Sequence, residues 1–333
     1  MIATLIGFLL VVVFLALAFG PLESLGWWRD KGAARVRDSL QRLVSEQPAG
    51  AAAPDYEQFV VYLSGIGAID PTSVPPEEVP LVEALRERLP TFCVADDVFP
   101  YSVSNRGLTA QRALAGLWRR VEKLRLDNPS SLLGMLVNAR NAIQLFVCAD
   151  RRYGPTYNIG TAQEILRSLI RHGYRLGSGV PVTLIGWSGG AQIALGACWY
   201  LGKLDLPLRV ISLGGMMADD HGIDHLEQLT HLRGSRDPLE RLGWIIFAGR
   251  WPGAVGSPWS RAREEGRIEV ITLGPMQHNG TAHYFDSATL APDGRSYLQV
   301  STDAIQAVLT GQPVRVIEPA PAAPDDPAPG REG

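Results

Sequence analysis

This chain of 333 residues has no excess of basic side chains and very little cysteine. Lys and Arg number 31 against 34 Asp and Glu, which gives a formal net charge of -3 at pH 7. This balance argues against the basic surface that nucleic-acid binding requires, so no nucleic-acid partner is expected. Cys93, Cys148 and Cys198 are too few and too scattered for a disulfide framework. We interpret them as buried thiols, and the odd count fits a reducing compartment.

Motifs that bind cofactors or metals are also missing. The glycine-rich stretch at residues 186–190 matches neither G-x-G-x-x-G nor a P-loop, so no nucleotide cofactor is expected. His221, His225 and His231 lie close together in the sequence. No H-E-x-x-H pattern or carboxylate at the required spacing accompanies them, so we expect no metal site.

A long apolar run opens the chain. Residues 1–20 carry no charged side chain, and the first acidic or basic residue is Glu23. At about 1.5 Å per residue, such a run crosses a hydrocarbon core of about 30 Å. We therefore predict a transmembrane anchor over residues 1–22. A cleaved signal peptide is the alternative, because residues 16–18 are Ala-Leu-Ala, although the basic n-region of a signal peptide is missing.

Basic residues follow this run, and they predict its orientation. They are Arg29, Lys31, Arg35 and Arg37. Because positively charged flanks stay on the cytoplasmic side, we expect a single-pass membrane protein with a cytoplasmic body. Residues 23–55 are predicted to form a juxtamembrane amphipathic helix and a linker.

In the body, short apolar runs alternate with longer helical patterns, which predicts an α/β fold with a mostly parallel sheet flanked by helices. Predicted strands occupy residues 59–63, 182–185, 208–213 and 268–273, with weaker candidates at 91–94 and 229–233. Predicted helices occupy residues 78–88, 107–125, 160–173, 189–202 and 301–310. The body spans 56–312, and the tail at 313–333, rich in Pro, Ala and acidic residues, is predicted to be disordered.

A second apolar stretch, at residues 131–149, contains Arg140 between Asn138 and Asn141. A charge at this position would be costly in lipid, so we predict a helix buried in the protein rather than a second span. We expect residues 98–150 to form a cap insertion.

The segment at residues 181–197, PVTLIGWSGGAQIALGA, predicts a strand, a tight turn and a helix. A serine at the tip of such a turn is held out for attack, and glycines two positions away on either side avoid clashes. The backbone N–H of Gly189, at the start of the helix, would stabilise an oxyanion. We therefore predict Ser188 as a nucleophile. The alternative is that the glycines only close a strand–helix turn.

The stretches ADRRYGPTYNIGTAQEIL, at residues 149–166, and VTLIGWSGGAQIALGA, at residues 182–197, resemble uncharacterised bacterial membrane-anchored members of the α/β-hydrolase superfamily. The resemblance covers roughly residues 58–312. It implies the α/β-hydrolase fold and a chain order of nucleophile, acid and histidine, so the acid and the base should follow Ser188.

With this order, Asp237 is the predicted acid, because it ends a Gly-x-x-Asp turn after a predicted strand. Asp219 and Asp220, after the preceding strand, are the alternatives. His278 is the predicted base, since it follows the last predicted strand, and His283 is its alternative.

The second oxyanion donor is expected from the loop after the first strand of the body. Small residues at 64–68, Ser-Gly-Ile-Gly-Ala, would let the backbone N–H of Ile66 approach the site. This loop has Ser-Gly where many members of the superfamily have His-Gly.

These residues predict a membrane-anchored serine hydrolase, similar to an esterase or lipase, that cleaves a small hydrophobic or lipid-like carboxylic ester. A non-catalytic relative that binds a lipid or a partner at the membrane is the alternative.

Overall fold

The structure, a computed structural model, describes residues 55–68, 74–101 and 132–317. Its strands are β1 (Gln58–Leu63), β2 (Phe92–Ala95), β3 (Val182–Trp187), β4 (Leu208–Leu213), β5 (Gln228–Gly234) and β6 (Ile268–Gly274). Its α-helices are α2 (Val79–Arg88), α4 (Leu132–Ala149), α5 (Gly154–Arg171), α6 (Gly189–Leu201), α7 (Pro238–Ile246), α8 (Pro258–Glu264) and α9 (Tyr297–Leu309). Short 3-10 turns lie at η2 (Gly202–Leu204), η3 (His221–His225) and η4 (Ala248–Arg250).

The described strands form one six-stranded sheet in the order β2-β1-β3-β4-β5-β6, and every neighbouring pair is parallel. The central strands β1 and β3 are buried along their whole length, which explains why they read as continuous apolar runs. The edge strand β6 is exposed at several positions. The predicted α/β class, a parallel sheet flanked by helices, is confirmed.

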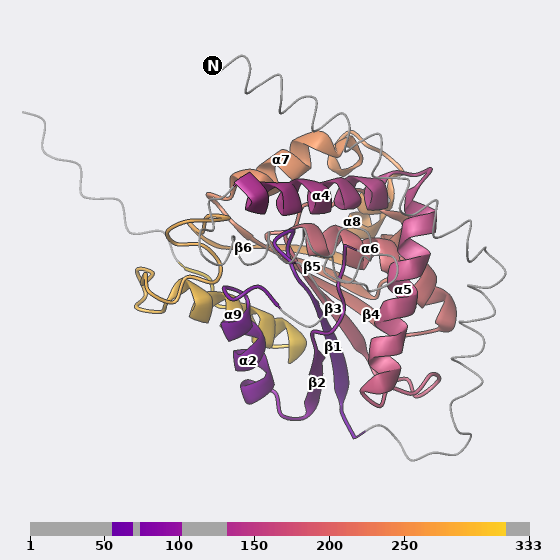
Figure 1. Cartoon of the computed structure of the whole chain (residues 1–333), viewed down its shortest axis with the longest axis horizontal. Helices are drawn as coiled ribbons and strands as arrows, with labels where there is room; N and C mark the ends of the chain where they lie inside the picture. The colour runs from indigo at the N-terminus through magenta and orange to yellow at the C-terminus, as the bar shows by residue number, and fades with distance from the viewer. Residues whose placement is uncertain (1–54, 69–73, 102–131, 318–333) are drawn as a thin grey trace, which may run out of the picture.

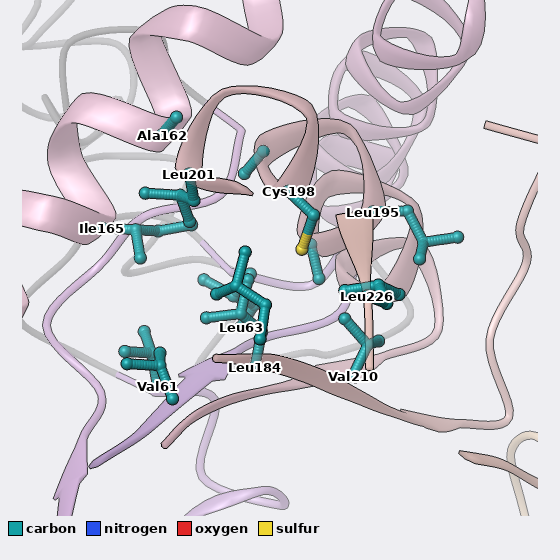
Figure 2. Packing of buried hydrophobic residues seen from close by; sticks show 14 of the residues in the cluster. Val61, Leu63, Ala162, Ile165, Leu184, Leu195, Cys198, Leu201, Val210 and Leu226 are labelled. Carbon is teal, nitrogen blue, oxygen red and sulfur yellow. The ribbon is translucent and has the colours of Figure 1, made fainter. Parts of the chain in front are cut away.

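Helices cover both faces of the sheet. Figure 1 shows α2 and α9 on one side of the sheet, α5 and α6 on the other, and α4 and α7 together beyond the end toward which the strands run. Figure 2 shows side chains of β1, β3 and β4 packed against those of α5 and α6, among them Leu184, Ile165 and Cys198. A second core, which includes Tyr62 and Ile305, fills the face under α2 and α9. The two cores fix the sheet from both sides.

All six predicted strands are present, the two weaker candidates included. The predicted helices at 78–88, 160–173, 189–202 and 301–310 correspond to α2, α5, α6 and α9, although α5 and α9 begin earlier than expected. Helices α7 and α8 are additional to the helices expected from the sequence. The helix expected at 131–149 is α4, which contacts α5 and α6.

Some predictions lie outside the described residues. They are the transmembrane anchor at 1–22, the juxtamembrane segment as far as residue 54, residues 102–131 of the predicted cap insertion with the helix at 107–125, and the predicted tail from residue 318 onward. In the portion that is described, no helix is long and apolar enough to cross a membrane.

The packed body extends beyond its predicted limit at residue 312. The backbone N–H of Ile317 donates to the carbonyl oxygen of Leu273 in β6 at 2.8 Å, and the Ile317 side chain is buried against Gly274. The first part of the predicted disordered tail, residues 313–317, is therefore packed on the sheet. The apolar side chain of Ile317 anchors this segment, although an acidic residue and a proline follow it directly in the sequence.

Candidate active site

Ser188 lies on a strained turn between β3 and α6. Its φ of 50° and ψ of -118° are rare for a residue with a side chain, and strain of this kind concentrates at functional sites. A Cβ on Gly186 would lie 2.3 Å from the Cα of Ala191. One on Gly190 would lie 2.3 Å from the carbonyl oxygen of Leu63. Close packing of α6 against β3 and β1 therefore requires glycine at both positions, as the sequence motif predicts.

Ser188, His278 and Asp237 form one chain of hydrogen bonds. The Nε2 atom of His278 lies 2.9 Å from the Oγ of Ser188, and its Nδ1 atom lies 2.8 Å from an Oδ of Asp237. All three residues are buried, and Ser188 keeps an exposed fraction of 7%. The three residues follow β3, β5 and β6, and the carboxyl ends of parallel strands meet at one edge of the sheet. The three residues that the sequence analysis chose are thus in contact.

Four donors hold the carboxylate of Asp237. One oxygen accepts from the backbone N–H groups of Leu239 and Glu240, as the N-cap of α7, and the other accepts from His278 and from the hydroxyl of Tyr284 at 2.9 Å. Burial raises the pKa of Asp237, but its hydrogen bonds and the nearby charge of His278 outweigh burial and hold this pKa below its usual value. Asp237 is therefore an ionised, fixed acceptor.

Aromatic side chains pack against the face of the His278 imidazole ring. The ring of His278 stacks on Trp187, with centroids 4.5 Å apart and planes at 21°. Trp187 in turn makes edge contacts with Tyr284 and Phe285. No role for these aromatic residues was expected from the sequence. Trp187 occupies the variable position before Ser188, and nothing in its spacing from His278 indicates the stacking.

A second Ser-His-acid chain lies beneath α7 and is sealed from solvent. The Nδ1 of His231 lies 3.0 Å from the Oγ of Ser212, and its Nε2 lies 3.1 Å from Glu240, which also contacts Arg250. All four residues are buried. Burial lowers the pKa of His231, which favours its neutral form. Since the backbone N–H of Glu240 caps onto Asp237, this network supports the carboxylate, and no reagent can reach Ser212.

The two predicted oxyanion donors are neighbours. A Cβ built on Gly189 would lie 3.0 Å from the Cγ2 of Ile66. The buried amide of Asn141, on α4, donates to the carbonyl oxygens of Ile66 and Ala68, each at 2.8 Å. A turn bond from the Ala68 N–H to the Gly65 carbonyl oxygen fixes the peptide that carries the Ile66 N–H. The sequence held one signal of this role, because a buried asparagine in an apolar helix needs a partner.

The alternative residues make other contacts in this structure. Asp219 pairs with Arg151 at 3.2 Å, and Asp220 accepts from Gln192 and caps η3. The Nδ1 of His283 accepts from the backbone N–H of Phe285. The chain of hydrogen bonds at Ser188 includes none of these three.

The other histidines and the cysteines have structural partners. His221 pairs with Asp224, and both His221 and His225 pack on Trp199. The three cysteines are free and buried, and burial raises the pKa of each thiol. Within the ranges that the structure describes, no three His, Cys, Asp or Glu side chains are grouped so that they could hold a metal ion.

The arrangement can activate a hydroxyl group. A neutral His278 can accept the proton of Ser188, and the anionic Asp237 can stabilise the resulting imidazolium. Comparison of the chain with protein-family models and with curated proteins finds no significant match.

Proposed function

We propose that the chain is a membrane-anchored serine hydrolase of the α/β-hydrolase type, which cleaves a carboxylic ester. The observation that carries the proposal is the hydrogen-bonded chain from Ser188 through His278 to Asp237, with Ser188 on a turn of positive φ. A structural serine has no need of both features.

In the proposed reaction, His278 accepts the proton of Ser188 while the Oγ attacks the ester carbonyl carbon. The tetrahedral intermediate collapses, His278 returns the proton to the departing alcohol, and an acyl-Ser188 ester remains. A water molecule then attacks this ester while His278 accepts its proton. The acyl–Oγ bond breaks, His278 returns the proton to the Oγ of Ser188, and the acid is released. Asp237 accepts from the Nδ1–H of His278 and so favours the tautomer whose Nε2 is unprotonated and can accept the proton of Ser188.

The oxyanion is proposed to bind between the backbone N–H groups of Ile66 and Gly189. Gly189 begins α6, so its N–H has no acceptor within the helix and lies at the positive end of the helix dipole. Donors of this kind stabilise the transition state because they are oriented before the reaction begins.

The topology supports the α/β-hydrolase type. The nucleophile follows β3, the acid follows β5 and the histidine follows β6, in the chain order that the superfamily uses. The motif joins a strand to a helix in a parallel sheet, which is the structural context that a G-x-S-x-G motif needs.

A hydrophobic substrate is supported by the surroundings of the site. Leu145 of α4 lies against Gly189, since a Cβ built there would be 2.8 Å from the Cδ1 of Leu145. The helix α7, whose N-cap is Asp237, exposes apolar side chains: Leu242, Trp244, Ile245 and Ile246. Together with the apolar run at residues 1–22, this surface favours a lipid-like ester presented at a membrane, with the body on the cytoplasmic side.

The proposal is tested with a fluorophosphonate probe and a series of p-nitrophenyl esters of increasing acyl length. We expect labelling of the wild type and loss of labelling in Ser188→Ala. Ser212→Ala is the matched control, because Ser212 also contacts a histidine but is sealed from solvent. An unlabelled wild type beside a labelled control hydrolase would contradict the proposal and favour a binding protein without catalytic activity.

A further inference from the structure

A buried carboxyl group holds one end of the loop that carries Ile66. Glu78 is the N-cap residue of α2, and its side chain turns inward rather than capping that helix. One of its oxygens accepts from the backbone N–H of Gly65 at 3.3 Å, and the other accepts from the hydroxyl of Tyr62 at 2.9 Å. Only 1% of Glu78 is exposed. The reaction outlined above does not use this group.

The bond to Gly65 places Glu78 close to the site. A Cβ on Gly65 would lie 2.5 Å from the Cδ1 of Trp187, the residue on which His278 stacks, and 3.5 Å from an oxygen of Glu78. The far end of the loop is held by Asn141 through the carbonyl of Ile66. The loop at residues 64–68, which carries Ile66, is called the oxyanion loop. Glu78, the N-cap of α2, and Asn141, on α4, therefore hold this loop at two points.

No cation faces Glu78 among the described residues. Tyr62 and Glu77 act on the pKa of Glu78, Glu78 in turn raises the pKa of Tyr101, and all three of these neighbours are acids. A fully buried carboxylate without a positive partner is costly, so the neutral acid is favoured. Burial is the main cause, and it raises the pKa of Glu78 to about 8.

We propose that Glu78 is a positioning residue whose uncharged carboxyl group holds the oxyanion loop in place, and that ionisation of Glu78 weakens catalysis. This proposal rests on the proposed hydrolase function. A neutral carboxyl orients Gly65 without adding negative charge beside the Ile66 N–H. An ionised carboxyl would lie near the place where the carbonyl oxygen becomes negative, in a water-poor site where charges interact strongly.

The test is the dependence of kcat on pH, measured between about pH 6 and pH 10 with a soluble p-nitrophenyl ester. In the wild type, kcat falls as the pH rises through about 8. Glu78→Gln keeps an accepting oxygen but cannot ionise. We expect it to retain kcat at pH 7 within about fivefold, the equivalent of one hydrogen bond, and to lose the alkaline fall. Glu78→Leu leaves Gly65 without its partner and should lose kcat by about 10²-fold at every pH.

Two further variants separate this role from general effects on folding. Glu77→Gln removes an exposed charge next to Glu78, and the alkaline fall should persist. Tyr62→Phe removes a hydrogen bond that favours the charged form, so the fall should move to higher pH. An alkaline fall that is identical in the wild type and Glu78→Gln would overturn the proposal.

Thermal unfolding gives a readout that needs no activity. The folded-state pKa of Glu78 lies above its ordinary value of 4.5, so burial of the neutral acid becomes less favourable as the pH rises from 4.5 to about 8. The Tm of the wild type should fall relative to Glu78→Gln across this window and then run level. A constant difference in Tm, with probe labelling intact, overturns the Glu78 proposal alone. A sloping difference with no labelling of Ser188 shows instead that the hydrolase function has failed.

Discussion

The imidazole of His278 lies flat against the indole of Trp187, with ring centroids 4.5 Å apart. Trp187 is the residue before Ser188, so the turn that presents the serine also supplies a wall for its histidine. We expect Trp187→Phe to keep the fold and reduce kcat by a few fold, because a smaller ring still stacks. Trp187→Ala should destabilise the protein by about 3–5 kcal/mol, measured by denaturant unfolding. An unaltered kcat in a folded Trp187→Ala protein would contradict this role.

Replacing Asp237 with Asn should separate chemistry from folding. Asn is as good an N-cap as Asp, so α7 should keep its start and the variant should stay folded. An amide cannot stabilise the imidazolium and favours the wrong tautomer, so kcat should fall by about 10⁴-fold. Ester turnover and thermal unfolding are measured on the same preparation. Asp237→Ala, in contrast, should lose stability as well as turnover.

The choice between His278 and His283 as the base can be decided by a matched pair of variants. His278→Ala should lose turnover by about 10⁴-fold or more, because it removes the imidazole that contacts the Oγ of Ser188. His283→Ala should retain turnover, since His283 bonds to the backbone N–H of Phe285 instead. Turnover that survives in His278→Ala but not in His283→Ala would make His283 the base.

The carboxylate of Asp237 predicts a loss of stability in acid. Its pKa is held below the ordinary value of 3.8, so the stabilisation is complete above that value and is lost as the pH falls through the lower folded-state pKa. Tyr284→Phe removes one of its hydrogen bonds and should move the acid transition to higher pH. The transition is followed by circular dichroism, and an identical acid transition in wild type and Asp237→Asn would argue against a contribution from this group.

The close approach of α6 to β1 predicts that Gly190→Ala is poorly tolerated. The added Cβ would meet the carbonyl oxygen of Leu63 at 2.3 Å, and backbone cannot move aside easily. We expect a loss of about 1–3 kcal/mol or more, measured as a lower Tm or a lower yield of folded protein. Gly253→Ala is the control, because a Cβ there has no atom within 4 Å.

The sequence predicted much of this architecture because parallel strands leave strong local signals. The strand–turn–helix motif predicted Ser188 as the nucleophile. The chain order implied by the resemblance then predicted Asp237 as the acid and His278 as the base. Helix α7 was missed because its outward face is apolar, with Trp244 and Ile245 exposed, so it lacks the polar face that marks a surface helix.

The supporting contacts of the site could not be predicted in the same way. The bond between Tyr284 and Asp237 joins residues that are 47 positions apart, and the bond between Asn141 and Ile66 spans 75 positions. Neither pair has a spacing that a motif could encode, because folding alone brings them together. Glu78 is also ambiguous in the sequence, since a glutamate before a helix is usually a solvated residue of its first turn.

The carboxylate of Asp237 has two attachments, the first turn of α7 on one oxygen and the imidazole of His278 on the other. The first turn of α7 and the imidazole of His278 are therefore bound by the same carboxylate. Asp237, which orients the base, is thus also the N-cap of the helix that exposes Trp244 and Ile245.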